Sequence, residues 1–171
     1  MALVVLLRGV NVGGHRRFSP AALAERLGHL GAVNIGAAGT LVVRRPVGRR
    51  ALRAELARAL PFECEIVLCD GREVAGLMSQ DFFAGQRERR DVVRFVSVLA
   101  RAPRRAPATP FDIPDAGPWL VRVLTRQGRF VVGTYRRHMR AIGRLGSLDR
   151  LFGVPVTTRN WRTMATIAEL L

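Results

Sequence analysis

The chain contains no lysine, so that arginine supplies all 28 of its basic residues. With only 13 acidic residues, the net charge is +15 at pH 7. A charge of this size favours anionic partners, because the field of the whole molecule attracts them whatever its origin. Arginine without lysine, beside abundant Ala, Gly and Val, is also the composition expected of a GC-rich coding sequence. The charge therefore predicts affinity for anions and leaves open whether nucleic acid is a biological partner.

Long hydrophobic runs and cysteines are scarce as well. The first apolar run, Ala2–Leu7, ends at Arg8 and is too short for a signal peptide or a membrane span. We therefore expect a cytoplasmic protein with no membrane partner. The two cysteines, Cys64 and Cys69, fall in one predicted strand at a spacing that turns them to opposite faces, which predicts no disulfide. No Cys or His has metal-ligand spacing, so the sequence predicts no metal site, and we expect no cofactor.

The first half of the chain has the pattern of a β-α-β-β-α-β unit. A run that is apolar on both faces opens it and predicts a central strand covered on both sides. One helix begins at Ser19-Pro20, a cap followed by a favoured first residue, and a second carries Leu52, Leu56 and Leu60. The predicted strands are Ala2–Arg8, Ala32–Gly36, Thr40–Arg44 and Glu63–Cys69.

The second half repeats this order, except that a proline-rich irregular segment replaces the first helix. The predicted elements are a strand at Asp91–Ala100, a hairpin of Trp119–Leu124 and Arg129–Tyr135, a helix from Arg137 to Phe152 with a core stripe of Met139, Ile142, Leu145 and Leu148, a strand at Val154–Thr158 and a C-terminal helix. We therefore predict an α+β fold of two tandem ferredoxin-like units, residues 1–80 and 91–171, with an extra C-terminal helix. A single mixed sheet is the alternative, and self-association into a homo-oligomer stays open.

Two motifs carry a resemblance to a known family. The chain has "LLRGVNVGG" directly after the first strand and "GVPVTTRNWRTMATIAEL" at its C-terminus. It resembles the bacterial family called domain of unknown function 1697, whose members begin with an LLRG-[IV]-NVGG loop and end with TTRNW before a helix. The resemblance implies two ferredoxin-like units and brings no established activity. Where the family has a polar Gln-Ser-Gly-Asn turn, this chain has Ala37-Ala38-Gly39-Thr40, which implies the loss of ligand-binding groups there.

The loop Gly9–Phe18 is the main candidate site. It is longer than a common strand-to-helix connection, and adjacent glycines let backbone N–H groups turn toward one point. It matches neither the Walker A loop nor GxGxxG. The predicted anion-binding residues are Arg8, Gly9, Asn11, Gly13, Gly14, Arg16 and Arg17. The alternative is a rigid turn, in which Asn11 is a local turn-former.

The TTRNW stretch adds two further candidates. Asn160 is placed to cap the last helix, and Arg159 to contact an anion beside that helix end. Both also fit a purely structural interpretation. The sequence thus favours a binding module for a phosphorylated or nucleotide-like small ligand, extending to nucleic acid. The alternatives are a small-molecule enzyme, whose catalytic residues the sequence does not identify, and a protein-interaction domain.

Overall fold

A computed structural model describes residues 1–171 as an α+β protein with two antiparallel sheets. The chain divides into two compact units, Met1–Ser79 with Ala165–Leu171, and Gln80–Met164. The sequence-based division placed the whole C-terminal helix with the second half, whereas its last residues belong to the first unit. Leu171 lies close to Gly71 of this unit, since a Cβ on Gly71 would be 2.8 Å from Cδ2 of Leu171.

The first unit follows the predicted β-α-β-β-α-β order. It comprises β1 (Leu3–Leu7), α1 (Pro20–Arg26), a 3-10 turn (Gly28–Leu30), β2 (Ala32–Asn34), β3 (Thr40–Val43), α2 (Arg49–Ala59), β4 (Ile66–Asp70) and α3 (Gly71–Met78). The strands form an antiparallel sheet in the order β2-β3-β1-β4. The predicted central position of the first strand is confirmed.

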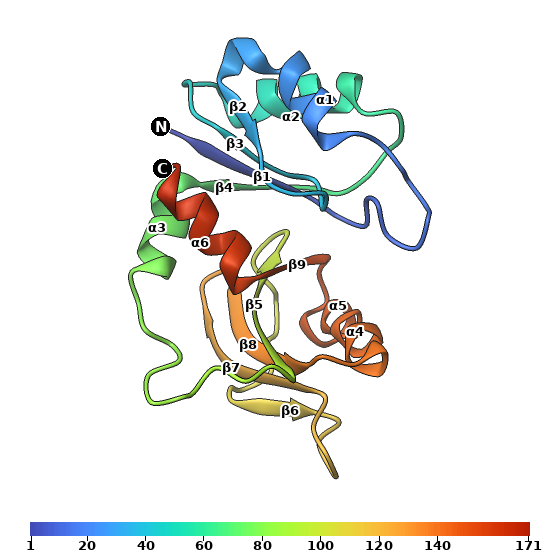
Figure 1. The fold of residues 1–171 in the computed structure, drawn as a ribbon, viewed down its shortest axis with the longest axis vertical. Coiled ribbons are helices and arrows are strands. Elements are labelled where there is room, and N and C mark those ends of the chain that lie inside the picture. The colour runs from blue at the N-terminus through green and yellow to red at the C-terminus, as the bar shows by residue number, and fades with distance from the viewer. The chain divides into compact units, whose positions relative to one another are not determined.

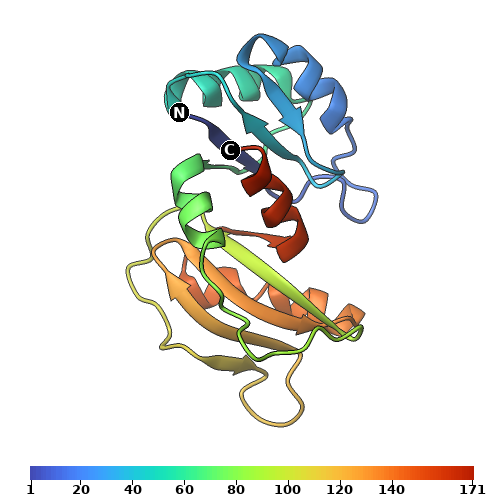
Figure 2. The ribbon, with the colours of Figure 1, turned by 60° about the vertical axis from the view of Figure 1, so that its left-hand side comes forward.

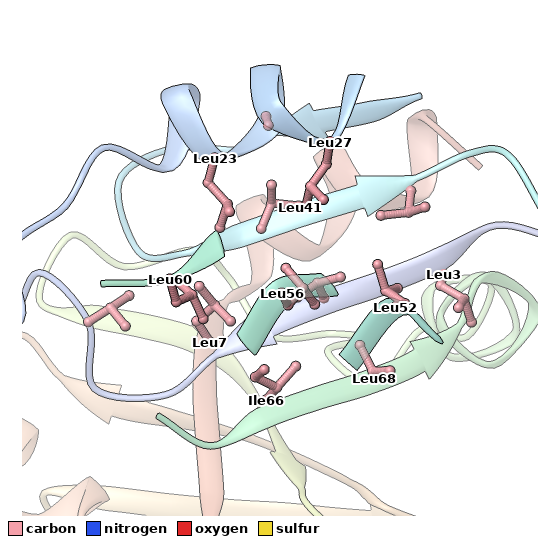
Figure 3. Packing of buried hydrophobic residues seen from close by; sticks show 14 residues of the cluster. Leu3, Leu7, Leu23, Leu27, Leu41, Leu52, Leu56, Leu60, Ile66 and Leu68 are labelled. Carbon is pink, nitrogen blue, oxygen red and sulfur yellow. The ribbon is translucent and has the colours of Figure 1, made fainter. Parts of the chain in front are cut away.

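Both faces of this sheet are covered. Helices α1 and α2 lie on one side, and α3 lies on the other (Figure 1). Leu23 of α1, Leu27 at the end of α1, and Leu52 and Leu56 of α2 meet the inward side chains of the strands. Figure 3 shows them against Leu7, Leu41 and Leu68. On the opposite face, Val4 and Leu6 are fully buried. An apolar run with no alternation has therefore formed a strand with no solvent-facing side.

The strand predicted at Glu63–Cys69 begins only at Ile66, and Cys64 lies before it. The prediction that Cys64 and Cys69 lie on opposite faces of one strand was therefore wrong. Both cysteines are free, and Cys69 is buried in β4.

The second unit has a five-stranded antiparallel sheet in the order β6-β7-β8-β5-β9. Its elements are β5 (Val92–Leu99), β6 (Phe111–Ile113), β7 (Val121–Gln127), β8 (Phe130–Arg136), α4 (Met139–Leu145), α5 (Leu148–Phe152) and β9 (Val156–Asn160). The last helix, α6 (Trp161–Glu169), begins in this unit. Helices α4 and α5 lie against one face of the sheet (Figure 2), where Leu148 and Phe152 enter the core.

Two predictions for this unit were wrong. Strand β6 lies within the proline-rich segment, where pairing with β7 overrides weak local propensity. The helix predicted from Arg137 to Phe152 is two short helices, because the chain breaks at Gly146 and the Ser147 hydroxyl donates to the carbonyl of Arg144 at 2.6 Å. As a result, Met139 and Ile142 of the predicted core stripe are exposed. None of the helices has the length and apolar character that crossing a membrane requires.

Candidate anion-binding loop

The loop after β1 folds back on itself as a miniature hairpin. The N–H of His15 donates to the carbonyl of Val12 at 3.0 Å, and that of Asn11 to the carbonyl of Arg16 at 3.2 Å. Gly13 and Gly14 occupy the two central positions with φ of +58° and +78°. Left-handed conformations at both central positions are those of a type I′ turn, which glycine adopts at little cost. The adjacent glycines thus have a structural reason.

Two side chains anchor the loop to the first unit. Val10 is 2% exposed and packs in the core. The amide of Asn11 donates from Nδ2 to the carbonyl of Ala37 at 2.8 Å and accepts at Oδ1 from the N–H of Phe18 at 3.0 Å. Because both polar atoms of this amide have partners within the protein, Asn11 positions the loop as a turn-former would.

Backbone strain accompanies this anchoring. Besides the glycines, Asn11 and Arg16 adopt left-handed conformations, with φ of +53° and +48°. Asparagine tolerates this region, whereas a long side chain such as that of Arg16 pays about 1 kcal/mol or more. Such a conformation persists only where the surroundings impose it. Here the two left-handed residues are joined by the hydrogen bond from the N–H of Asn11 to the carbonyl of Arg16.

Several donors of the loop have no acceptor in the protein. They are the backbone N–H groups of Gly13, Gly14, Arg16 and Arg17 and the side chains of His15, Arg16 and Arg17, all in exposed residues. The guanidinium groups fold back over the glycines: a Cβ on Gly9 would lie 3.9 Å from Nη1 of Arg16, and one on Gly14 would lie 3.5 Å from Nη2 of Arg17. Five of the predicted residues, Gly9, Gly13, Gly14, Arg16 and Arg17, are thus brought together on one loop.

Arg8 and the half-buried Cys64 lie at the base of the loop. The N–H of Arg8 donates to the carbonyl of Glu65 at 3.0 Å, beside Cys64 in the chain. Burial raises the pKa of the Cys64 thiol, the positive charge of Arg16 acts to lower it, and the charge of Glu65 acts to raise it. The charge of Arg16 therefore acts on the Cys64 thiol, so the reactivity of that thiol is a measure of the charge at the loop.

Helix α1 adds little to the site. The Ser19 hydroxyl accepts from the N–H of Ala22 at 3.1 Å, as the predicted cap should. Since the helix start is already capped, an anion at this loop would rely on the hairpin N–H groups and the guanidinium groups.

The turn between β2 and β3 packs directly against the loop. The carbonyl of Gly39 accepts from the N–H of Leu7 at 2.8 Å, and a Cβ on Gly39 would lie 2.6 Å from Cγ2 of Val10. The turn Ala37–Thr40 is thus adjacent to the glycine-rich motif. In this chain Ala37 and Ala38 bring no polar side chain to that place.

Arg159 and Asn160 lie in the second unit. Arg159 is 7% exposed, and its Nη1 donates to Oγ1 of Thr157 at 3.0 Å and to the carbonyl of Thr158 at 2.9 Å. Burial lowers the pKa of Arg159 to about 10. Oδ1 of Asn160 accepts from the N–H of Thr163 at 2.8 Å, so Asn160 is the helix cap that the sequence predicted. A contact between Arg159 and an anion stays a prediction.

A charged cluster that the sequence did not indicate lies on β6–β8. The Arg122 guanidinium donates from Nε and Nη2 to the two carboxylate oxygens of Asp112, both at 2.8 Å. The guanidinium carbons of Arg122 and Arg136 lie 4.6 and 4.1 Å from the ring centroid of Trp119. The hydrogen bonds from Arg122 hold the pKa of Asp112 below its ordinary value. No sequence signal marked this pair, because Asp112 belongs to the strand that was not predicted.

A hollow of about 400 Å³ lies elsewhere in the first unit, with Leu3, Val47, Arg49 and Asp70 among its walls. Arg49 donates to the carbonyl of Leu68 at 2.9 Å and pairs with Asp70, also at 2.9 Å. The hollow includes none of the predicted site residues.

Two antiparallel sheets with covering helices, and a glycine-rich cationic loop after the first strand, define the class of this α+β protein. The chain belongs to the family described as protein of unknown function (DUF1697), whose model matches residues 1–126. The matched part includes the first-loop motif and ends before TTRNW.

Comparison with curated proteins gives no match. Among solved structures, the chain is similar to the conserved bacterial protein SP0830 from Streptococcus pneumoniae. The two are 17% identical, with 99% of this chain and 97% of the other covered and a TM-score of 0.62. This likeness shows the fold alone.

Proposed function

We propose that the protein binds a small phosphorylated or nucleotide-like ligand at the first loop. The observation that carries the proposal is the hairpin Asn11–Arg16, in which Asn11 and Arg16 adopt strained left-handed conformations. The exposed N–H groups of this hairpin and the guanidinium groups of Arg16 and Arg17 have no acceptor in the protein. Successive backbone N–H groups around left-handed residues form concavities that suit anions. Guanidinium groups add paired, charge-assisted donors that match the geometry of phosphate oxygens.

Preorganisation supports a discrete site over diffuse attraction. Val10 and Asn11 fix the base of the loop. The backbone is therefore already ordered before a ligand binds, and binding costs less conformational entropy. The same arginine-rich surface extends the proposal to the phosphates of nucleic acid, with the net charge of +15 supplying attraction.

We also propose that both sheets are versions of one ferredoxin-like plait. The order β7-β8-β5-β9 in the second unit corresponds to β2-β3-β1-β4 in the first. The segment that contains β6 then takes the place of the first helix, which leaves α4 and α5 as the counterpart of α2.

The test is a calorimetric titration with inorganic phosphate, nucleoside phosphates and a short RNA at about 50 and 200 mM salt. We expect saturable binding of a phosphate compound that survives the higher salt and weakens about tenfold on Arg16→Ala. Gly13→Val should weaken it too, because valine does not tolerate φ of +58°.

Arg58→Ala is the matched control. Arg58 is exposed on α2, has no partner in the protein, and its removal changes the net charge equally. Binding that decays steeply with salt and responds equally to Arg16→Ala and Arg58→Ala would be diffuse attraction of polyanions, and the proposal would fail.

A further inference from the structure

Helix α4 presents an apolar stripe to solvent. Met139, Ile142, Gly143 and Gly146 follow one another at i, i+3, i+4 and i+7, the spacing that places residues on one side of a helix. Met139 is 77% exposed and Ile142 is 52% exposed. Two large apolar side chains side by side on one short helix make a surface that water solvates poorly.

Gly143 lies beside these two residues, and no contact within the protein requires a glycine at this position. Glycine in a helix interior costs about 1 kcal/mol relative to alanine. A Cβ at Gly143 would meet no atom within 4 Å, and its φ lies outside the left-handed region. Neither packing nor backbone conformation requires a glycine here. What it does provide is a notch next to two projecting side chains, where another backbone can approach closely.

The charge around this stripe has one sign. Arg140 and Arg144 are exposed on α4 and have no acceptor in the protein, and the helix carries no acidic residue. The carboxylate of Asp149, on α5, accepts from the N–H of Val156 at 3.0 Å. An occupant of this surface would therefore need apolar groups for the stripe and negative charge for the flanking guanidinium groups.

We propose that the face of α4 formed by Met139, Ile142 and Gly143, flanked by Arg140 and Arg144, docks an acidic amphipathic helix of another protein. This α4 face lies in the second unit and is a different surface from the first loop. The projecting side chains would enter the grooves of the arriving helix, and the notch at Gly143 would receive one of its ridges. With two turns of α4 involved, the interface is small and the complex transient.

Charge and shape decide against other occupants. A second copy of this chain would bring the same arginines face to face, in a protein of net charge +15. An anionic membrane would attract the arginines. A fluid bilayer, however, would bind more strongly to a large apolar side chain at position 143 than to a glycine, so the notch does not favour a membrane. The notch favours a helix, whose surface has a fixed shape that can fit into it.

The test uses the full chain and a synthetic peptide of about 20 residues, long enough to be helical, with Leu and Ile on one face and Glu elsewhere. A peptide of the same composition with its apolar residues spread around the helix is the control. Binding is measured by fluorescence anisotropy and located by amide chemical shifts. We expect micromolar affinity for the patterned peptide, at least tenfold weaker binding of the control, and shifts centred on α4.

Variants distinguish binding that depends on the notch at Gly143 from non-specific hydrophobic binding. Gly143→Leu should weaken peptide binding at least tenfold, and Met139→Ser with Ile142→Ser should abolish it. Gly76→Leu is the matched control, since Gly76 also lies in a helix with no atom within 4 Å of its would-be Cβ. Gly143→Ala should raise the unfolding temperature, because alanine is favoured over glycine inside a helix. The unfolding temperature of each α4 variant, measured by circular dichroism, shows whether that variant is folded.

Three results would overturn the proposal. One is equal binding of the two peptides. Another is undiminished binding by Gly143→Leu. The third is α4-dependent binding to vesicles of phosphatidylcholine and phosphatidylglycerol in the absence of peptide binding, which would identify a membrane surface as the occupant.

Discussion

The side-chain amide of Asn11 donates a 2.8 Å hydrogen bond to the backbone carbonyl of Ala37. This bond links the glycine-rich loop to the turn between β2 and β3, so that two segments far apart in the sequence form one surface. Because Ala37 and Ala38 carry no polar side chain, the turn adds no charged group to this surface. In this chain the loop alone supplies the charged groups.

Asn11→Ala should loosen the loop and destabilise the first unit. The substitution removes the bonds to Ala37 and Phe18 and places alanine at φ of +53°. We expect a loss of about 2 kcal/mol in the free energy of unfolding, with contributions from both the bonds and the left-handed backbone. The Phe18 amide should exchange its hydrogen faster, which hydrogen-exchange mass spectrometry measures. Asn11→Gly, which removes only the bonds, should lose about half as much.

Gly39→Ala should be more damaging than the same change at Gly36. Both glycines have φ of +69°, but a Cβ on Gly39 would lie 2.6 Å from Val10 and 2.8 Å from Leu7, whereas one on Gly36 meets nothing within 4 Å. We expect about 1 kcal/mol for Gly36→Ala from backbone strain and about 3 kcal/mol for Gly39→Ala, where overpacking adds to it. Urea unfolding measures both. Equal losses would show that the turn does not press against the loop.

The alkylation rate of Cys64 should report on the charge of Arg16. The thiolate is the reacting form, and Arg16 acts to lower the pKa of this thiol. Arg16→Ala therefore raises that pKa further, leaves less thiolate at pH 8, and should slow modification by iodoacetamide. Glu65→Gln should have the opposite effect, because the charge of Glu65 acts to raise the pKa. Cys69 is fully buried and should stay unmodified. Saturating phosphate that slowed Cys64 in the same way as Arg16→Ala would indicate an anion at the loop.

Stability of the second unit should fall in acid through Asp112. Arg122 holds the pKa of this carboxyl below its ordinary value, so the folded state favours the carboxylate. The resulting stabilisation is present above the unfolded pKa of about 4 and is lost as the pH falls through the lower folded pKa. Asp112→Asn should therefore destabilise the protein at pH 7, and the difference from the parent should shrink toward pH 2 in chemical denaturation.

Asp115→Asn is the control for this effect. Asp115 is exposed and has no partner in the protein, so its removal changes the net charge by the same amount without breaking a bond. A pH dependence that is the same for both variants would mean that general charge repulsion, and not the Arg122 pair, governs acid stability.

Local patterns predicted the first unit better than the second. The spacing of Leu23 and Leu27, the Ser19-Pro20 start and the unbroken apolar run of β1 each act within a few residues, and the structure agrees with all three. Two elements of the second unit depend on distant partners. Strand β6 exists because Phe111 pairs with Val123, and the exposed side of α4 follows from a break at Gly146 that helical periodicity does not reveal.

The candidate loop shows the same division. Adjacent glycines, positive charge and excess length are properties of the sequence, and they alone were enough to single out residues 8–18. The tertiary structure decided what those residues do: Asn11 bonds to Ala37 and Phe18, and Arg16 adopts a left-handed backbone. Those contacts join residues that are distant in sequence, and the free energy of such contacts depends on the packing of the whole unit, which no local pattern contains.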